Sequence, residues 1–164
     1  MKILINAIVL FLIGMVSSCS AQARNGATND NEISAELGQV SVKVLVKSLP
    51  KLQPCDAASS WRWGVENACP RTIIGSVTIK AFGKPLFVPL SAFADLGNPR
   101  NVKVESRKEK ESFAVILKGG DAATSYSAIL EFRNNILSER VVRHGEFPDE
   151  SWEKTIYKFN MSNL

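Results

Sequence analysis

Residues 40–47 read VSVKVLVK, and this stretch decides the fold class. Its four valines occupy every second position, from Val40 to Val46, and serine or lysine fills most of the positions around them. Successive side chains of a β-strand point to opposite faces of its sheet. The pattern therefore predicts a strand that buries one valine face and leaves its other face in water.

The same alternation recurs through the rest of the chain. Apolar residues take alternate positions in the ranges 73–81, 102–105, 113–117, 126–132 and 155–159. One-sided alternation of this kind indicates an antiparallel sheet. Gly119-Gly120-Asp121 and Asn134-Asn135 separate neighbouring patterns, and these residue types accept the positive φ angles that tight hairpin turns require.

A single short helix interrupts this predicted β structure. Ser91 is a suitable N-cap for a helix over 92–96, which Gly97 and Pro99 would end. A chain of 164 residues favours one domain. We therefore expect an all-β domain over residues 35–164, a small antiparallel sandwich or open barrel of about seven to eight strands with one short helix.

The first residues of the chain have the layout of an export signal. Residues 3–16 are apolar except for Asn6, and the single positive charge of Lys2 precedes them. A helix of about 14 residues spans roughly 21 Å, whereas the core of a bilayer is about 30 Å thick. Small residues follow directly, so residues 1–18 are predicted to be a secretory signal peptide that delivers the domain to an oxidising compartment.

The end of this leader, Val16-Ser17-Ser18-Cys19, resembles the lipobox of bacterial lipoproteins. The resemblance implies cleavage before Cys19 and attachment of acyl chains such as palmitate to its thiol and new amine. Ser20 follows, in place of an aspartate. By resemblance to Gram-negative lipoproteins, this implies sorting to the outer membrane, with the domain facing the periplasm.

A second processing route stays open at this stage. Ala21-Gln22-Ala23 is a small-x-small site for ordinary signal peptidase, and cleavage there would release a soluble periplasmic or secreted protein beginning at Arg24. On the lipoprotein route, residues 19–34 comprise the lipidated cysteine and a small, polar, flexible tether. A coil of about 15 such residues has an end-to-end distance of roughly 20 Å.

Either route removes Cys19 from the folded domain and leaves Cys55 and Cys69, an even pair predicted to form one disulfide. It would close a loop of about 15 residues and stabilise the fold by roughly 3 kcal/mol. The loop carries Trp61, Arg62 and Trp63. These are either candidate partner-binding residues, because Trp and Arg dominate many interfaces, or a plug in which the tryptophans close one end of the core.

His144, the only histidine, lies close in sequence to Glu146 and Asp149. A histidine beside a carboxylate is a candidate acid–base pair for a small hydrolase. No nucleophile motif accompanies it, so the preferred interpretation is a solvated loop at a Gly/Pro turn. Residues 100–111 hold a dense run of mixed charges, interpreted as an edge or loop that discourages aggregation between sheets.

The function expected from these features is binding without catalysis. Removing residues 1–18 takes away one lysine and no acid, so the net charge falls from +4 to +3, too mild to predict nucleic-acid binding. No metal or cofactor pattern is present. We expect an envelope lipoprotein whose partners are the membrane, through its lipid, and an unidentified envelope protein or polymer, as an inhibitor, immunity-type protein or accessory subunit. The alternatives are a small-ligand carrier in a β-barrel and a periplasmic hydrolase using His144.

Overall fold

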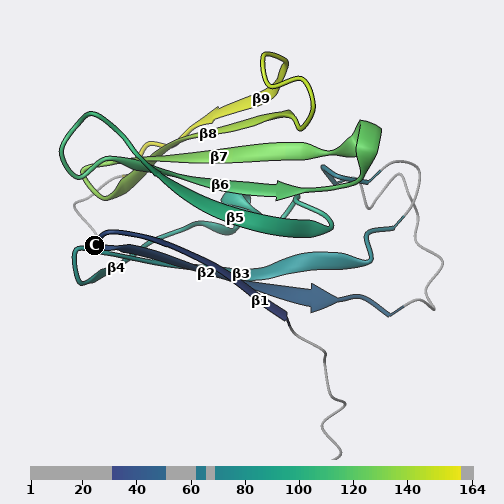
Figure 1. Ribbon diagram of the computed structural model, residues 1–164, viewed down its shortest axis with the longest axis horizontal. Helices are drawn as coiled ribbons and strands as arrows, with labels where there is room; N and C mark the ends of the chain where they lie inside the picture. The colour runs from purple at the N-terminus through teal and green to yellow at the C-terminus, as the bar shows by residue number, and fades with distance from the viewer. Residues whose placement is uncertain (1–30, 51–61, 66–68, 160–164) are drawn as a thin grey trace, which may run out of the picture.

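The computed structural model describes residues 31–50, 62–65 and 69–159, which form two antiparallel sheets packed face to face (Figure 1). One sheet has four strands in the order β1-β2-β3-β4 and the other has five in the order β5-β6-β7-β8-β9. The all-β prediction is confirmed, and the arrangement is a sandwich. The strands are β1 (Asn31–Leu37), β2 (Val40–Ser48), β3 (Thr72–Ala81), β4 (Lys84–Leu86), β5 (Pro99–Ser106), β6 (Phe113–Gly119), β7 (Tyr126–Arg133), β8 (Ile136–His144) and β9 (Ser151–Ile156).

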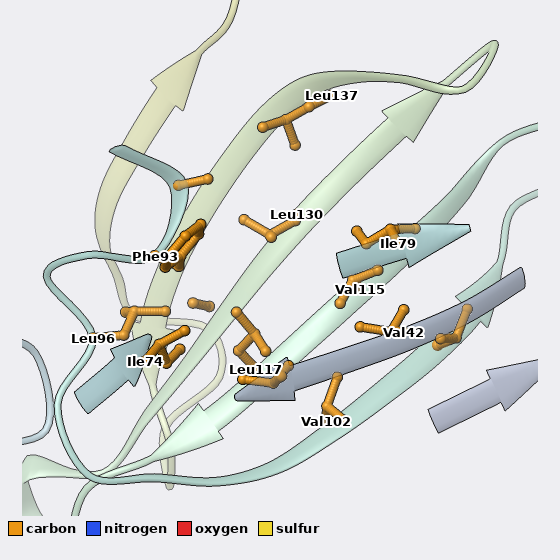
Figure 2. Close-up of a cluster of buried hydrophobic side chains, with 14 of the residues drawn as sticks. Val42, Ile74, Ile79, Phe93, Leu96, Val102, Val115, Leu117, Leu130 and Leu137 are labelled. Carbon is orange, nitrogen blue, oxygen red and sulfur yellow. The ribbon is translucent and has the colours of Figure 1, made fainter. Parts of the chain in front are cut away.

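The core lies between the two sheets, and the valine face of β2 is part of it. Val42 and Val44 are fully buried. Figure 2 shows Val42 and Ile79 of one sheet in the same cluster of buried side chains as Val115 and Leu130 of the other. Fully burying an aliphatic or aromatic side chain contributes about 1.5–3 kcal/mol, so this packed layer is the main source of stability.

Strand β1 begins before the predicted end of the tether. Residues 31–34 pair with β2, from Asn31 opposite Val46 onward, so the predicted boundary at residue 34 is wrong. The residues of β1 are only partly buried or exposed, and Ile33 and Ala35 are the two that pack against the core. Residues 19–30, with the predicted lipidation site Cys19, lie outside the described residues.

The predicted helix over 92–96 is also wrong. A short 3₁₀ helix, η1, covers Leu90–Ala92, with Ser91 inside it and Pro89 at its N-cap. The backbone beyond η1 bonds to another segment: the Asp95 carbonyl accepts from the Trp63 amide at 2.9 Å, and the Gly97 amide donates to the Trp63 carbonyl at 2.8 Å. These bonds replace helical ones and allow the neighbouring apolar side chains to enter the core.

The two predicted turns differ in outcome. Asn134 and Asn135 form a two-residue hairpin turn with φ angles of 49° and 64°, as the sequence predicts. The connection after Gly119 is longer than a tight turn and contains the 3₁₀ helix η2 (Ala122–Thr124), whose N-cap Asp121 forms a capping box with Thr124.

The strand connections gather at two opposite ends of the sandwich (Figure 1). At one, which we call the hairpin end, lie the β1–β2, β3–β4, β5–β6 and β7–β8 turns, at residues 38–39, 82–83, 107–112 and 134–135. At the other, the disulfide end, lie the β2–β3, β6–β7 and β8–β9 connections. Along the sides, β1 lies beside β5, while residues 87–98 run over the opposite side and bond to β8 through Arg140.

Candidate functional site

The predicted disulfide and partner-binding loop are only partly described. Cys69 is disulfide-bonded. Its pairing with Cys55 stays a prediction, because Cys55 and Trp61 lie outside the described residues. The Arg62 guanidinium donates through Nη1 to the Ala94 carbonyl, which ties this loop to the segment that follows η1.

Trp63 packs inward. Its ring stacks on Trp152 of β9, with centroids 5.0 Å apart and planes inclined by 13°, and its Nε1 donates to the Glu153 carboxylate at 3.3 Å. The side chain is partly buried against the core cluster. Trp63 therefore packs at one end of the core, as the second interpretation of the loop expected.

Beside Trp63 lies an ion-pair network that sequence reasoning did not find. Arg140 of β8 is only 3% exposed. Its Nη2 lies 2.7 Å from Asp95 Oδ2, and its Nη1 lies 3.3 Å from Glu153 Oε1 and donates to the Ser91 carbonyl at 3.1 Å. Arg140 pairs with the buried Leu130 in register, so it occupies an inward position where the strand pattern leads one to expect an apolar residue. The network joins β8, β9 and the 87–98 segment.

His144 is buried at the end of β8, so the prediction of a solvated loop is wrong for this residue. Its Nδ1 accepts hydrogen bonds from the backbone amides of Glu146, at 3.0 Å, and Phe147, at 3.1 Å. A neutral imidazole that accepts at Nδ1 carries its proton on Nε2. Trp152 packs edge-on against the ring. The imidazole therefore serves as an acceptor that shapes the β8–β9 turn.

The surroundings of His144 do not assemble the acid–base pair that the sequence suggested. Glu146 and Asp149 are both exposed. His144 also lines none of the four cavities described below. The geometry consequently gives no support to a hydrolytic role for this group.

The disulfide end holds a cavity of about 550 Å³ beside Cys69. Its polar groups are largely engaged in internal bonds. The Asn98 side-chain oxygen accepts from the amides of Arg71 and Thr72, at 2.8 and 3.2 Å, and Arg100 is paired with Asp121. These bonds hold the β2–β3 and β6–β7 connections against the start of β5, so the cavity walls act mainly as scaffold.

Three further cavities lie at the hairpin end, with volumes of about 360, 350 and 150 Å³. The first two share Arg107, Glu109 and Ser112 in their linings. Of the eight exposed large apolar residues in the described part of the chain, four line these hollows. They are Leu37 and Phe82 in the largest cavity and Phe87 and Ile136 in the smallest, with exposed fractions of 44%, 41%, 62% and 37%. Hydrogen bonds from Asn135 to Glu111 join the rims of these two cavities.

Strained backbone is concentrated at the same end. Of the six non-glycine residues with positive φ in the described ranges, Phe82, Glu111, Asn134 and Asn135 lie here. Phe82 and Gly83, with φ of 52° and 77°, form the two-residue β3–β4 turn in the conformation that the asparagines adopt in the β7–β8 turn. Asparagine tolerates this conformation, whereas a bulky aromatic residue rarely adopts it. Strain of this kind gathers at functional sites.

The charged side chains around the cavity of about 360 Å³ are not all paired with one another. Arg107 binds Glu131, with Nη2 2.6 Å from Oε1, and lies 3.3 Å from Glu105. The Glu131 hydrogen bond is the main cause of the raised pKa of Arg107. Glu105 has a lowered pKa, chiefly because of its hydrogen bond from Lys103. Glu109 and Glu111 line the cavity without an ion pair to any residue that the structure describes.

Comparison with known proteins places this chain in no family and beside no protein of known function. No protein-family model, curated protein or solved structure matches this chain significantly. Within the described residues, no group of three or more His, Cys, Asp or Glu side chains is placed to hold a metal ion. No helix of this part is both long and apolar enough to cross a membrane. The candidate site therefore rests on its own geometry.

Proposed function

We propose that this protein is a non-catalytic binding module of the cell envelope and that the hairpin end is its docking surface for another protein. The observation that carries the proposal is that Leu37, Phe82, Phe87 and Ile136 are exposed around two cavities of the hairpin end whose rims are hydrogen-bonded to each other. Apolar area in water is unfavourable, and clustered exposed apolar residues mark interaction sites. Aromatic anchors in pockets supply much of the binding energy of such interfaces.

The proposed attachment leaves this surface free. The leader and lipobox support a lipid anchor at Cys19, from which the chain reaches the domain at Asn31. Asn31 pairs with Val46, near the disulfide end of β2, so the chain enters the sandwich at the end opposite the docking surface. An anchored domain of this kind presents its hairpin end to partners away from its point of attachment.

The two alternative functions receive less support from the geometry. A ligand carrier needs an apolar interior cavity, but the space between the sheets is filled by the core cluster. A hydrolase using His144 needs that imidazole to face a pocket, but His144 lines none of the four cavities described above, and its Nδ1 accepts hydrogen bonds from two backbone amides. Binding through a surface is therefore the function that we propose.

The test is affinity capture from detergent-solubilised envelope with matched variants. Ile136 and Leu49 are each 37% exposed, but Ile136 lies at the hairpin end and Leu49 follows β2 at the disulfide end. We expect Ile136→Asn and Phe87→Asn to lose the partner that the wild type recovers, while Leu49→Asn retains it. Equal recovery by all variants, or recovery of no partner by the wild type, would contradict the proposal.

A further inference from the structure

We propose that the partner segment presents an aromatic or long aliphatic side chain next to a lysine or arginine, and that this pair occupies the cavity between the Phe82 turn and the β5–β6 loop. This inference rests on the proposed function and adds to it the chemistry of the bound segment. The cavity is built wholly from described residues, and its volume of about 360 Å³ lies near the lower end of the range for ligand pockets.

The floor of this cavity is apolar. Val40, Val104 and Phe113 are buried core residues that reach its lining, and Leu37 and Phe82 stand exposed above them. Because the lining joins directly to the core, an inserted apolar side chain would continue the packing between the sheets. That continuity favours a large apolar side chain over a small or polar one.

The rim of the cavity is acidic. Glu109 and Glu111 line it, and the positive charge of Arg107 is already bound by Glu131 and Glu105. Lys108 and Lys110 belong to the same loop, but neither lines this cavity; Lys108 lines the neighbouring cavity of about 350 Å³. A cation on the partner would therefore meet carboxylates with no competing ion pair in the described structure, which gives specificity through complementary charge.

Phe82 is suited to be the fixed anchor of this contact. Its backbone is held in the left-handed region by the tight β3–β4 turn, and its amide donates to the Gln39 carbonyl at 3.1 Å. An anchor whose backbone is fixed before binding loses less conformational freedom on association than one on a mobile loop. This smaller loss on binding is a reason for an aromatic residue to occupy the strained turn position.

The probe is a displayed library of random short peptides, selected on the immobilised mature protein. We expect enrichment of an aromatic or leucine residue within a few positions of a lysine or arginine. A synthesised peptide from this selection should bind Phe82→Asn about tenfold more weakly and the Glu109→Gln/Glu111→Gln variant several-fold more weakly. Leu49→Asn should bind as the wild type does. Added salt should weaken wild-type binding and have less effect on the double glutamine variant.

The outcomes separate this inference from the proposed function. Selected peptides without basic residues, or with equal affinity for the double glutamine variant, would overturn the partner chemistry; loss of binding to Phe82→Asn would then still support the docking surface. Equal affinity for Phe82→Asn overturns both the anchor and this surface. A selection that enriches no sequence also counts against the inference. A thermal melt of Phe82→Asn at or above the wild-type temperature shows that weaker binding is not caused by unfolding.

Discussion

Phe82 takes the first turn position between β3 and β4 with φ of 52°, where most L-residues are strained by roughly 1–2 kcal/mol. Asn134 takes the equivalent position between β7 and β8 with φ of 49°. We predict that Phe82→Asn leaves the free energy of unfolding unchanged or raised, because relief of strain offsets the lost apolar contact. Conversely, Asn134→Phe should lower it by about 1–2 kcal/mol. Urea titration of both variants measures these two changes in the free energy of unfolding. A clear loss of stability in Phe82→Asn would mean that this side chain serves packing rather than docking.

Tyr126 is a second residue whose environment has a measurable effect, in this case on how stability depends on pH. It is 1% exposed, and burial raises its pKa, with the charge of Asp95 adding to the shift and that of Arg140 opposing it. Unfolded tyrosines ionise near pH about 10. Because the folded-state pKa is the higher one, the contribution of Tyr126 to stability is complete below that pH and is lost as the pH rises through the folded pKa.

Tyr126→Phe tests this linkage. The Tyr126 hydroxyl has no hydrogen-bond partner among the described residues, so its removal should leave stability at neutral pH equal or raise it by about 1 kcal/mol. The variant should also lose less stability than the wild type between about pH 9 and pH 11. Urea midpoints at several alkaline pH values measure the difference, and parallel curves for the two proteins would show that Tyr126 ionises as readily when folded.

At the scale of elements, Arg140 joins β8, β9 and the segment 87–98. Removing one partner of a buried ion pair leaves the other charges uncompensated, at a cost of about 3–5 kcal/mol for fully buried groups. Asp95 and Glu153 are each 29% exposed, so solvent reduces this effect. We predict that Arg140→Met lowers the free energy of unfolding by about 2–3 kcal/mol, whereas Arg133→Met, at the exposed end of β7, changes it by less than about 0.5 kcal/mol. Equal effects of the two variants in denaturant titration would show that the network adds nothing to stability.

The strands themselves divide into those that the sequence predicts and those that it does not. Strand β2 was predictable because its alternate valines need a buried face, and the Asn134-Asn135 turn because its residues accept positive φ. Strand β1 was missed because only Ile33 and Ala35 give it a partly buried apolar face, and its pairing with β2 is not visible in the local sequence. The helix over 92–96 failed because Trp63, distant in sequence, takes the backbone bonds at Asp95 and Gly97.

The candidate site was harder to predict for a related reason. Phe82-Gly83 follows a recognisable strand pattern at 73–81, so the turn itself was detectable, but nothing local indicates that an aromatic residue there adopts positive φ. The mixed charges at 100–111 were interpreted as an edge or loop that discourages aggregation between sheets. Only the tertiary arrangement pairs Arg107 with Glu131 and thereby leaves two glutamates at an apolar cavity.

At the scale of the whole molecule, the disulfide and the proposed docking surface lie at opposite ends of the sandwich. A change at the disulfide should therefore alter stability without altering binding. Cys69 is disulfide-bonded at the disulfide end, and with Cys55 as its partner the closed loop of about 15 residues would contribute roughly 3 kcal/mol. We predict that Cys55→Ala/Cys69→Ala lowers the melting temperature by about 10 °C. Well below that temperature the variant should still bind the hairpin-end peptide with wild-type affinity, because the cavity floor is formed by residues of β2, β5 and β6 at the end away from Cys69. Calorimetry and a peptide titration measure the two effects on one sample. Loss of binding in a folded variant would mean that the two ends are coupled through the sheets, and an unchanged melting temperature would mean that the disulfide does not stabilise the sandwich.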